Sequence, residues 1–543
     1  MSRCLPVALF LAWPLLAQPS CPSTPVWSPC DLAFDLQPGE NAATVQLRGE
    51  FRSSQRTYLM PAFRDGNRLV LRFSPTEPGI WSYRLTSNVK RLDGTEGRFS
   101  AGESDSPGFV RVANVHHFQY EGTGKGHLWM ATALDRFVSM PRDQFDQFVD
   151  RRAKEKFTHL RVTLDRGTDL REAAERIRAI NAKGITADLA LGSIPDDPRE
   201  REQYITDIVA RFAAMNVTWM GIPSFENTPH NRAALKDAGA IIAKLDPYQH
   251  PRTTLATTTS GGLLGDGWMT MIDYGTPDPN IGAVEHQLFQ VPGIDSGIHN
   301  VNDLWNATMN GQYPASGSGQ YMTAWFDFMS GNRYWELEPY FDAKGGRAIA
   351  LDGVEYIVYM EKPGPVSVKV ESHGYDIAWI NPETGERIKE KGYKGGRYTG
   401  EPPDTAHPWV LHISREGAKG RMLKSWKFES RPVPVQEIEQ NADKIPFEID
   451  APAAGDISIS YPPYFALKAR RETPATKSLL VEWTGEVLVN GEGYRVIGTG
   501  REGTMHIPAS VAPTIPTPLS VRVALLNAYG KAYVLDRIYR LIP

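Results

Sequence analysis

The sequence predicts a multidomain α/β plus all-β protein in which a (β/α)8 TIM barrel is flanked by β-sandwich domains. Three observations support this prediction: the length of 543 residues, a change from alternating apolar residues to strand–helix repeats near His127, and a return to alternation after Phe326. A chain of this length is too long for a single hydrophobic core. Strand–helix repeats are typical of parallel sheets, whereas alternation is typical of half-buried antiparallel strands.

The first residues predict an export signal at residues 1–17. Arg3 supplies a positive start, and Val7 to Leu16 form a short apolar core that ends at a small-residue cleavage site. The run is shorter than the roughly 20 residues that a membrane span needs. We therefore expect a secreted or periplasmic protein without a membrane span. Cys21 and Cys30 could pair in such an oxidising compartment, although closeness in sequence does not guarantee a suitable geometry.

Composition shifts place the domain boundaries. We expect a first β-sandwich at residues 22–115, where runs such as TVQLRGEF and GIWSYRLTS alternate. The barrel is expected at residues 116–343, because HLWMATA, THLRVTL, ITADLAL and VTWMGIP each precede a helical pattern. TTLAT, WMTMIDY, IGAVE and QYMTAWF are predicted as the remaining four strands. A second sandwich is expected at residues 344–430, and a terminal, fibronectin-III-like sandwich at residues 431–543.

Charge and motif content narrow the classes of function. The net charge of −4 leaves no basic footprint, so nucleic acid is not an expected partner. The chain has no Gly-x-Ser-x-Gly elbow, which argues against an esterase. We expect no cofactor and no metal: the histidines lack ligand spacing, and the adjacent His116 and His117 would point to opposite faces of a strand. Oligomeric state is not predicted.

Glu226 is the first candidate catalytic residue. It comes directly after the fourth predicted strand and before Asn227, where the loops of a (β/α)8 barrel carry the chemistry. Glycosidases use a carboxylic acid there to protonate the departing sugar. The alternative is an acidic residue that only stabilises the start of the next helix, by about 0.3–1 kcal/mol.

Glu285 is the second candidate, because glycosidic cleavage needs two facing carboxyl groups. It ends the predicted strand IGAVE and is followed by His286. Asp165 and Asp273 hold similar strand-end positions and could replace it. A retaining pair should lie about 5–5.5 Å apart and an inverting pair about 6.5–9.5 Å apart. The alternative is a buried structural carboxylate that pairs with a neighbouring Arg or His.

Further side chains are candidates for substrate binding. Arg161, on the second predicted strand, could orient the nucleophile or simply neutralise Asp165. Tryptophan faces at a barrel mouth can stack on sugars, although core packing explains at least half of the candidates. The complete set of predicted substrate-binding residues is Arg161, Asn227, Trp219, His286, Trp325, Trp268, Asp165 and Asp273.

Several motifs together resemble a known family. They are MPAFRDGNRLVLRFSPTEPGIWSYRLTS, HLWMATALDRF, IVARFAAMNVTWMGIPSFEN, LDPYQHPRTT and EYIVYMEKPGPVSVKV. Over roughly Val26 to Trp426 the chain is similar to exported bacterial glycoside hydrolases of the apiosidase-like group. These carry an N-terminal domain of unknown function, a clan-A-type barrel and a β-domain of the collagen-binding type. The resemblance implies that Glu226 is the acid/base and that Glu285 matches the position of the nucleophile.

The first barrel strand departs from this family. The family pattern is Trp-Leu-Gly-Asp-Thr-Ala-Trp, whereas this chain has WMATAL from Trp129 to Leu134. The sequence therefore supports two hypotheses. The first is an exported glycoside hydrolase that cleaves poly- or oligosaccharides with two carboxylates, retaining the configuration. The second is a non-catalytic carbohydrate-binding or adhesion protein on a degenerate barrel.

Overall fold

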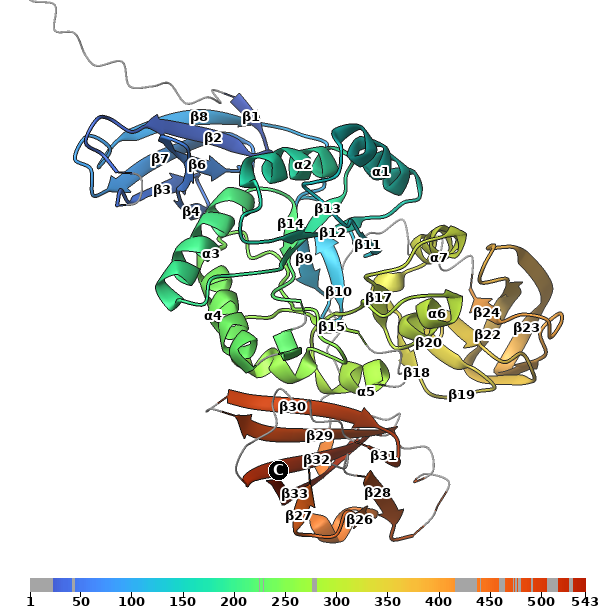
Figure 1. The fold of residues 1–543 in the computed structure, drawn as a ribbon. Helices are drawn as coiled ribbons and strands as arrows, with labels where there is room; N and C mark the ends of the chain where they lie inside the picture. The colour runs from blue at the N-terminus through green and yellow to red at the C-terminus, as the bar shows by residue number, and fades with distance from the viewer. Residues whose placement is uncertain are drawn as a thin grey trace, which may run out of the picture. The chain divides into compact units, whose positions relative to one another are not determined.

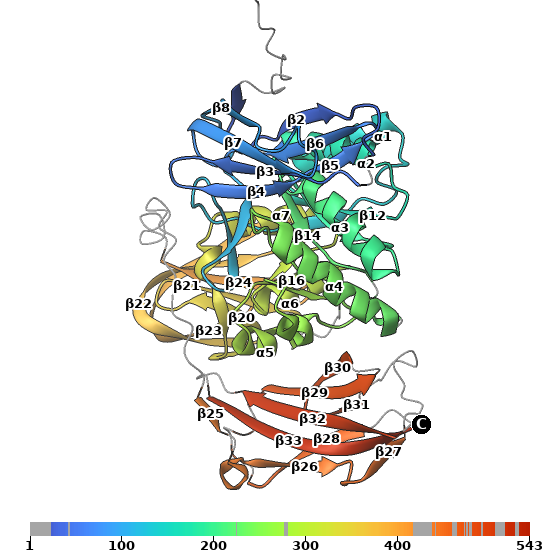
Figure 2. The same ribbon diagram turned by 90° about the vertical axis from the view of Figure 1, so that its left-hand side faces the viewer.

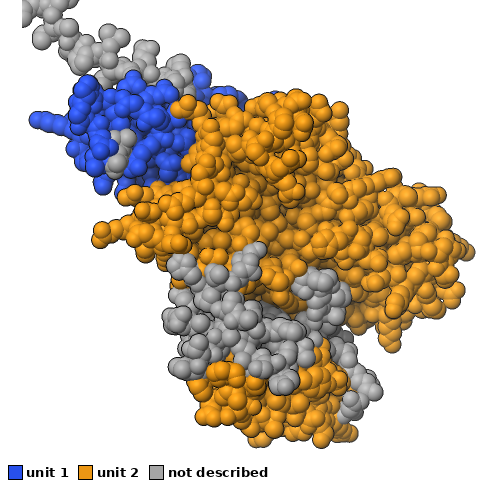
Figure 3. Space-filling model, viewed as in Figure 1, with its two compact units in different colours: residues 1–105, 206–215 blue, residues 106–205, 216–543 orange. Residues whose placement is uncertain are grey.

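The structure is a computed structural model that divides into two compact units (Figure 3). One unit comprises residues 1–105 and 206–215, and the other comprises residues 106–205 and 216–543. The structure describes residues 23–41, 44–223, 225–227, 229–275, 281–415, 437–439, 441–458, 464–471, 473, 476, 480–489, 492–504, 516–526 and 531–543. The predicted export signal and Cys21 lie outside these residues; Cys30 is disulfide-bonded.

The first unit consists of two sheets that face each other. The five-stranded sheet has the order β1-β8-β7-β3-β4, and the three-stranded sheet has the order β2-β6-β5. The strands are β1 (Ser23–Pro25), β2 (Cys30–Asp35), β3 (Leu47–Arg52), β4 (Thr57–Pro61), β5 (Phe63–Asp65), β6 (Arg68–Phe73), β7 (Gly79–Ser87) and β8 (Glu96–Gly102). Phe51 of one sheet stacks on Phe73 of the other, with ring centroids 4.2 Å apart. The alternating pattern therefore buries one face of each sheet, as the sequence predicts.

The second unit begins with a hairpin and continues with parallel strands and helices. The hairpin strands are β9 (Val110–Ala113) and β10 (His117–Tyr120). One parallel sheet has the order β11-β12-β13-β14, and a second has the order β15-β16-β17. The strands are β11 (Ala131–Ala133), β12 (His159–Leu164), β13 (Thr186–Leu191), β14 (Val217–Trp219), β15 (Ile272–Tyr274), β16 (Gly293–Asp295) and β17 (Gln312–Pro314). The α-helices are α1 (Arg142–Lys154), α2 (Leu170–Ala182), α3 (Pro198–Phe212), α4 (Pro229–Leu245), α5 (Ile281–Leu288), α6 (Val301–Met309) and α7 (Gln320–Ser330).

One short segment links the two parallel sheets. Arg252 forms an isolated parallel bridge with Trp219 of β14, and its carbonyl accepts the amides of Thr270 and Met271, just before β15. This segment therefore occupies the place of a strand between β14 and β15. In Figures 1 and 2, helices α2 and α4 lie to the outside of strands β12 to β14.

Two predicted strands are wrong. IGAVE forms helix α5 and QYMTAWF forms helix α7. Periodicity alone cannot distinguish a short apolar run in a strand from one in a helix. In α7 the buried residues Met322, Trp325 and Met329 are spaced by three and four, which is the spacing of one helix face. The last two parallel strands are instead β16 and β17, three residues each and too short to give a pattern.

Antiparallel strands follow the parallel ones. A seven-stranded sheet has the order β18-β20-β21-β24-β22-β19, with β23 paired to β22. Its strands are β18 (Glu338–Tyr340), β19 (Ala343–Lys344), β20 (Arg347–Leu351), β21 (Glu355–Met360), β22 (Val366–Ile380), β23 (Arg387–Gly400) and β24 (Trp409–Ser414). This period-two region is β-structure, as predicted.

The last part of the chain forms two further sheets, of orders β25-β33-β32-β29-β30, with β27 paired to β33, and β26-β28-β31. Their strands are β25 (Glu437–Glu439), β26 (Phe447–Ala451), β27 (Asp456–Ser458), β28 (Tyr464–Ala469), β29 (Leu480–Val489), β30 (Glu492–Thr499), β31 (Glu502–Thr504), β32 (Thr517–Leu526) and β33 (Lys531–Ile542). Phe465 and Trp483 belong to the buried cluster that the two sheets share. Among the described residues, no helix has the length and apolar character of a membrane span.

Candidate active site

A buried ionic cluster joins the two parallel sheets. Asp273 is the middle residue of β15 and has no exposed surface. Arg161 of β12 donates through Nη2 to Asp273 Oδ2 (3.3 Å), and Ser296 Oγ donates to the same oxygen (2.9 Å). Arg161 Nη1 also donates to Ser296 Oγ (2.9 Å). The three side chains thus form a closed triangle that fixes the Asp273 carboxyl group.

The charge of Glu226 acts on this triangle. Burial raises the pKa of Asp273 to about 7; the charges of Asp188 and Glu226 act in the same direction, whereas Arg161 and Ser296 oppose it. Arg161, Asp273 and Glu226, which the sequence identified separately, therefore interact electrostatically in the structure. Arg161 pairs with Asp273, which corrects the alternative that it neutralises Asp165.

Glu226 lies in a single turn of 3-10 helix, η1 (Phe225–Asn227), which follows β14. Its Oε1 accepts the backbone amide of Thr257 at 2.7 Å. Burial raises the pKa of the Glu226 carboxyl, and the Thr257 amide opposes this effect by stabilising the charged form. A half-buried carboxyl group with a raised pKa is suited to hold a proton for transfer. The side chain of Asn227 is outside the described part of the structure.

Asp295 is a site residue that the sequence reasoning missed. It is the last residue of β16, is 8% exposed, and accepts the amide of Gly297 at 2.7 Å. Burial raises the pKa of Asp295 to about 8, and the nearby charge of Asp273 adds to the effect. The signal was the short run GIDSG, in which an apolar residue leads into an acid followed by Ser and Gly. Three residues of strand are too few for period-two alternation to be recognised.

A chain of buried polar groups reaches Asp188, whose charge acts on Asp273. His159 Nδ1 contacts Asp188 Oδ1 at 2.6 Å, and Thr218 Oγ1 donates to the same oxygen at 2.5 Å. His127 Nε2 lies 2.8 Å from His159 Nε2, so one of these two nitrogens carries the shared proton. Asp188, His159 and Thr218 are fully buried. These hydrogen bonds hold the Asp188 carboxylate in place next to the cluster that contains Asp273.

Glu285 does not belong to the cluster, which corrects its predicted strand-end position. It lies in α5 with no exposed surface, and its carboxylate accepts hydrogen bonds from Thr259 Oγ1 (2.6 Å) and Tyr274. Tyr274 and Asp273 are successive residues of one strand and point to opposite faces. Glu285 therefore lies on the face of β15 away from Asp273. Burial raises the pKa of Glu285 to about 7.

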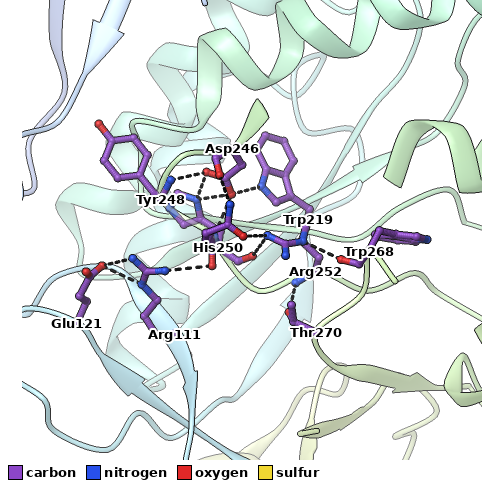
Figure 4. A network of polar contacts seen from close by, with 10 residues as sticks. Arg111, Glu121, Trp219, Asp246, Tyr248, His250, Arg252, Trp268 and Thr270 are labelled. Carbon is purple, nitrogen blue, oxygen red and sulfur yellow. Dashed lines mark hydrogen bonds and ion pairs between the residues drawn. The ribbon is translucent and has the colours of Figure 1, made fainter. Parts of the chain in front are cut away.

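The tryptophans predicted to stack on sugar are core residues. Trp219 is 0% exposed, and Trp268 and Trp325 are each 1% exposed. Figure 4 shows the network around Trp219: its Nε1 donates to Asp246 Oδ2 (3.0 Å), which also accepts the amide of His250 (2.9 Å). This bonding explains the motif LDPYQHPRTT in physical terms, since Asp246 organises the turn that follows α4. Strand position alone does not reveal which side chains face the interior.

His286, a predicted substrate-binding residue, lies in a different group of side chains. Together with His116 and His117 it faces Glu338 of β18. Burial lowers the pKa of His286 to about 4. The prediction that the two adjacent histidines point apart is wrong, because His116 precedes β10 and follows Asn114 and Val115, both of which have positive φ. Among the described residues, His116, His286 and Glu338 are the group whose donor atoms could hold a metal ion.

Comparisons with known proteins agree with this fold. Residues 23–88 match the profile of a domain of unknown function, DUF5060, which confirms that part of the predicted organisation. The chain is similar to a candidate glycoside hydrolase from Bacteroides vulgatus ATCC 8482, with 16% identity and a TM-score of 0.61 over 72% of this chain and 99% of that one. It is also similar to a glycoside hydrolase family 5 structure from the same organism, with 13% identity and a TM-score of 0.48 over 57% and 94% of the two chains. No curated protein matches the sequence.

At these identities the likeness concerns the fold. The first similar structure is covered almost completely and spans most of this chain, so the multidomain arrangement of sheets with a strand–helix region is shared. Function has to be argued from the cluster of acidic side chains itself.

Proposed function

We propose that this protein is an exported glycoside hydrolase that cleaves O-glycosidic bonds in poly- or oligosaccharides. The observation that carries the proposal is the position of three acidic side chains in or directly after neighbouring parallel strands: Glu226 after β14, Asp273 in β15, where Arg161 bonds to it, and Asp295 at the end of β16. The machinery of glycosidases is one carboxyl group with a raised pKa, which gives a proton, and a second that is ionised and stabilises positive charge at the sugar.

We assign the proton-donor role to Glu226 and the role of the facing carboxylate to Asp295. Both residues follow or end a parallel strand, which is where barrel enzymes carry their chemistry. The seven parallel strands and the segment at Arg252 support a (β/α)8 barrel, in which β14 would be the fourth strand and β16 the seventh. Arg161 and Asp273 would hold the cluster together beneath the substrate. Retention of configuration is expected if Asp295, in its ionised form, attacks the sugar directly.

The finer assignment to the apiosidase-like group and the collagen-binding type of the β-domain rest on the sequence resemblance, and export rests on the predicted signal at residues 1–17. The rival proposal, a carbohydrate-binding protein without activity, is favoured by the buried state of the three candidate tryptophans and by the altered first strand. Activity decides between the two proposals.

The test compares two isosteric variants on a panel of aryl glycosides. Asp295→Asn should lose turnover on all substrates, because no facing carboxylate remains. Glu226→Gln should lose turnover on poor leaving groups but keep it on dinitrophenyl glycosides, which need no proton. Asp165→Asn, an exposed strand-end control, should behave like the wild type. Wild-type turnover in both cluster variants would overturn the assignment. Binding of oligosaccharide without hydrolysis by the wild type would favour the rival.

A further inference from the structure

A second cluster of titratable side chains lies apart from the acidic cluster. His116 precedes β10, His286 is in the last turn of α5, and Glu338 begins β18. The ligand atoms of these three residues all lie within 4.8 Å of one another. They come from distant parts of the sequence, since Glu338 is 222 residues from His116 and 52 residues from His286. Among the described residues, no hydrogen bond or ion pair joins these three side chains to Glu226 or Asp295.

Hydrogen bonding fixes which nitrogen of His116 faces the carboxylate. His116 Nε2 lies 3.0 Å from the carbonyl oxygen of Phe289, which only accepts hydrogen bonds. Nε2 therefore carries the proton, and in a neutral ring Nδ1 presents a lone pair. That lone pair points towards the Glu338 carboxylate, 3.3 Å from Oε2 and 3.5 Å from Oε1. Two acceptors facing each other at this distance repel unless a proton or a metal cation lies between them.

A second imidazole converges on the same carboxylate. His286 Nε2 contacts Glu338 Oε2, and the His286 and His116 rings lie with their centroids 3.6 Å apart. His117 faces the other carboxylate oxygen, with Nε2 3.5 Å from Oε1, while its Nδ1 contacts Tyr313 Oη at 2.6 Å. One carboxylate thus has three imidazoles around it, although its single negative charge can balance one imidazolium at most.

We propose that His116 Nδ1, His286 Nε2 and a Glu338 carboxylate oxygen bind a divalent transition-metal ion of the zinc type. Two imidazole nitrogens and one carboxylate oxygen are a donor set that Zn2+ accepts. With bonds of about 2.0–2.2 Å, tetrahedral donors lie roughly 3.3–3.6 Å apart. Donor atoms that now lie up to 4.8 Å apart would therefore approach each other, whereas the close contact between His286 and Glu338 would open. The bond from His116 Nε2–H to the Phe289 carbonyl is the outer-shell contact that orients metal-bound histidines.

The position of the site indicates a structural role. The metal would tie the start of β10 to α5 and to β18, where the antiparallel sheet begins. The side chain of Glu338 remains 44% exposed, which leaves a path for the ion from solvent. His117, held by Tyr313, would position the carboxylate from outside the ligand set. Binding to a preformed site of this kind stabilises the folded state.

The experiment uses the full chain without a histidine tag. After dialysis against EDTA, ZnCl2 is titrated by calorimetry, and metal content is measured by mass spectrometry. We expect about one Zn2+ per chain, a rise in Tm of about 5 °C, and the visible absorption of a tetrahedral site when Co2+ replaces Zn2+. His286→Ala and Glu338→Gln should each weaken binding at least about tenfold.

Two control variants make the result specific. His373→Ala removes a half-exposed histidine of β22 that pairs with Glu371, and should bind metal like the wild type. Asp295→Asn should also keep full binding, because the acidic cluster is a different site. The proposal is overturned if folded wild-type protein takes up neither Zn2+ nor Co2+, or if binding is lost in Asp295→Asn but kept in Glu338→Gln. The wild-type measurement decides even where a variant fails to fold.

Discussion

Arg161 Nη2 donates a hydrogen bond to Asp273 Oδ2 across 3.3 Å, joining a strand of one parallel sheet to a strand of the other. The Asp273 side chain is fully buried and that of Arg161 is 10% exposed, so this ion pair is shielded from solvent. A buried pair contributes little net stability, but removing one partner leaves the other charge without compensation. The first prediction below, for Arg161→Met, depends on this arrangement.

Loss of Arg161 should destabilise the protein. Arg161→Met is expected to lower the free energy of unfolding by about 3 kcal/mol, because Asp273 would lose its counter-charge inside the fold. Protonation of Asp273, whose pKa is already about 7, limits the loss. Chemical denaturation measures this loss in the free energy of unfolding. The double variant Arg161→Met/Asp273→Asn should recover part of the stability, and an additive double variant would contradict the pairing.

The contributions of Asp273 and Asp295 to stability should decrease as the pH rises from about 4 to 8. The pKa values of Asp273 (about 7) and Asp295 (about 8) are above the ordinary value of 3.8, so in this range the folded state binds more protons than the unfolded state. Each group contributes a slope of at most about 1.4 kcal/mol per pH unit, ending near its folded-state pKa. Unfolding free energies of the wild type and Asp295→Asn should show a shallower slope in the variant. Asp165→Asn, at an exposed position, should leave the slope unchanged; an equal slope in Asp295→Asn would refute the shift.

Glu285→Gln should keep most of the turnover, in contrast to Asp295→Asn. Glu285 lies on the other face of β15 and accepts hydrogen bonds from Thr259 and Tyr274, contacts that an amide oxygen can also accept. We expect kcat/KM within about threefold of the wild type and a stability change of about 1 kcal/mol. Steady-state kinetics on the best aryl glycoside provide the measurement. A loss of several orders of magnitude would restore Glu285 as the nucleophile.

Trp219→Phe should affect stability and leave substrate affinity unchanged. The variant removes the Nε1–H that donates to Asp246 Oδ2 at 3.0 Å, inside a fully buried network. Leaving part of a buried carboxylate without its donor costs about 1–3 kcal/mol. Denaturation curves and KM values separate the two effects. A raised KM at unchanged stability would show that the ring contacts sugar after all. Trp325→Phe, which loses a bond to the neutral Thr308 Oγ1, is the matched comparison and should cost less.

The sequence by itself determined the succession of alternating, strand–helix and again alternating regions, the parallel strands through β14 with their helices, and Glu226, Asp273 and Arg161 as residues of interest. Those features depend on periodicity, on charge at strand ends and on short motifs, which are local properties of the chain. The same local reasoning predicted a strand for Glu285 and sugar-stacking positions for the tryptophans. An apolar run does not reveal which secondary-structure element it forms or which of its side chains become buried.

Tertiary structure alone decided which carboxyl groups act on each other. Asp295 and Asp273 belong to different three-residue strands, and strand pairing places Asp295 opposite Tyr274, the residue next to Asp273, so that the two charges interact. The same holds for His116, His286 and Glu338, whose convergence depends on left-handed turn residues and on the contact of His286 in α5 with Glu338 in β18. Burial, which raises the carboxyl pKa values, is likewise a property of the packed chain and is absent from any local pattern.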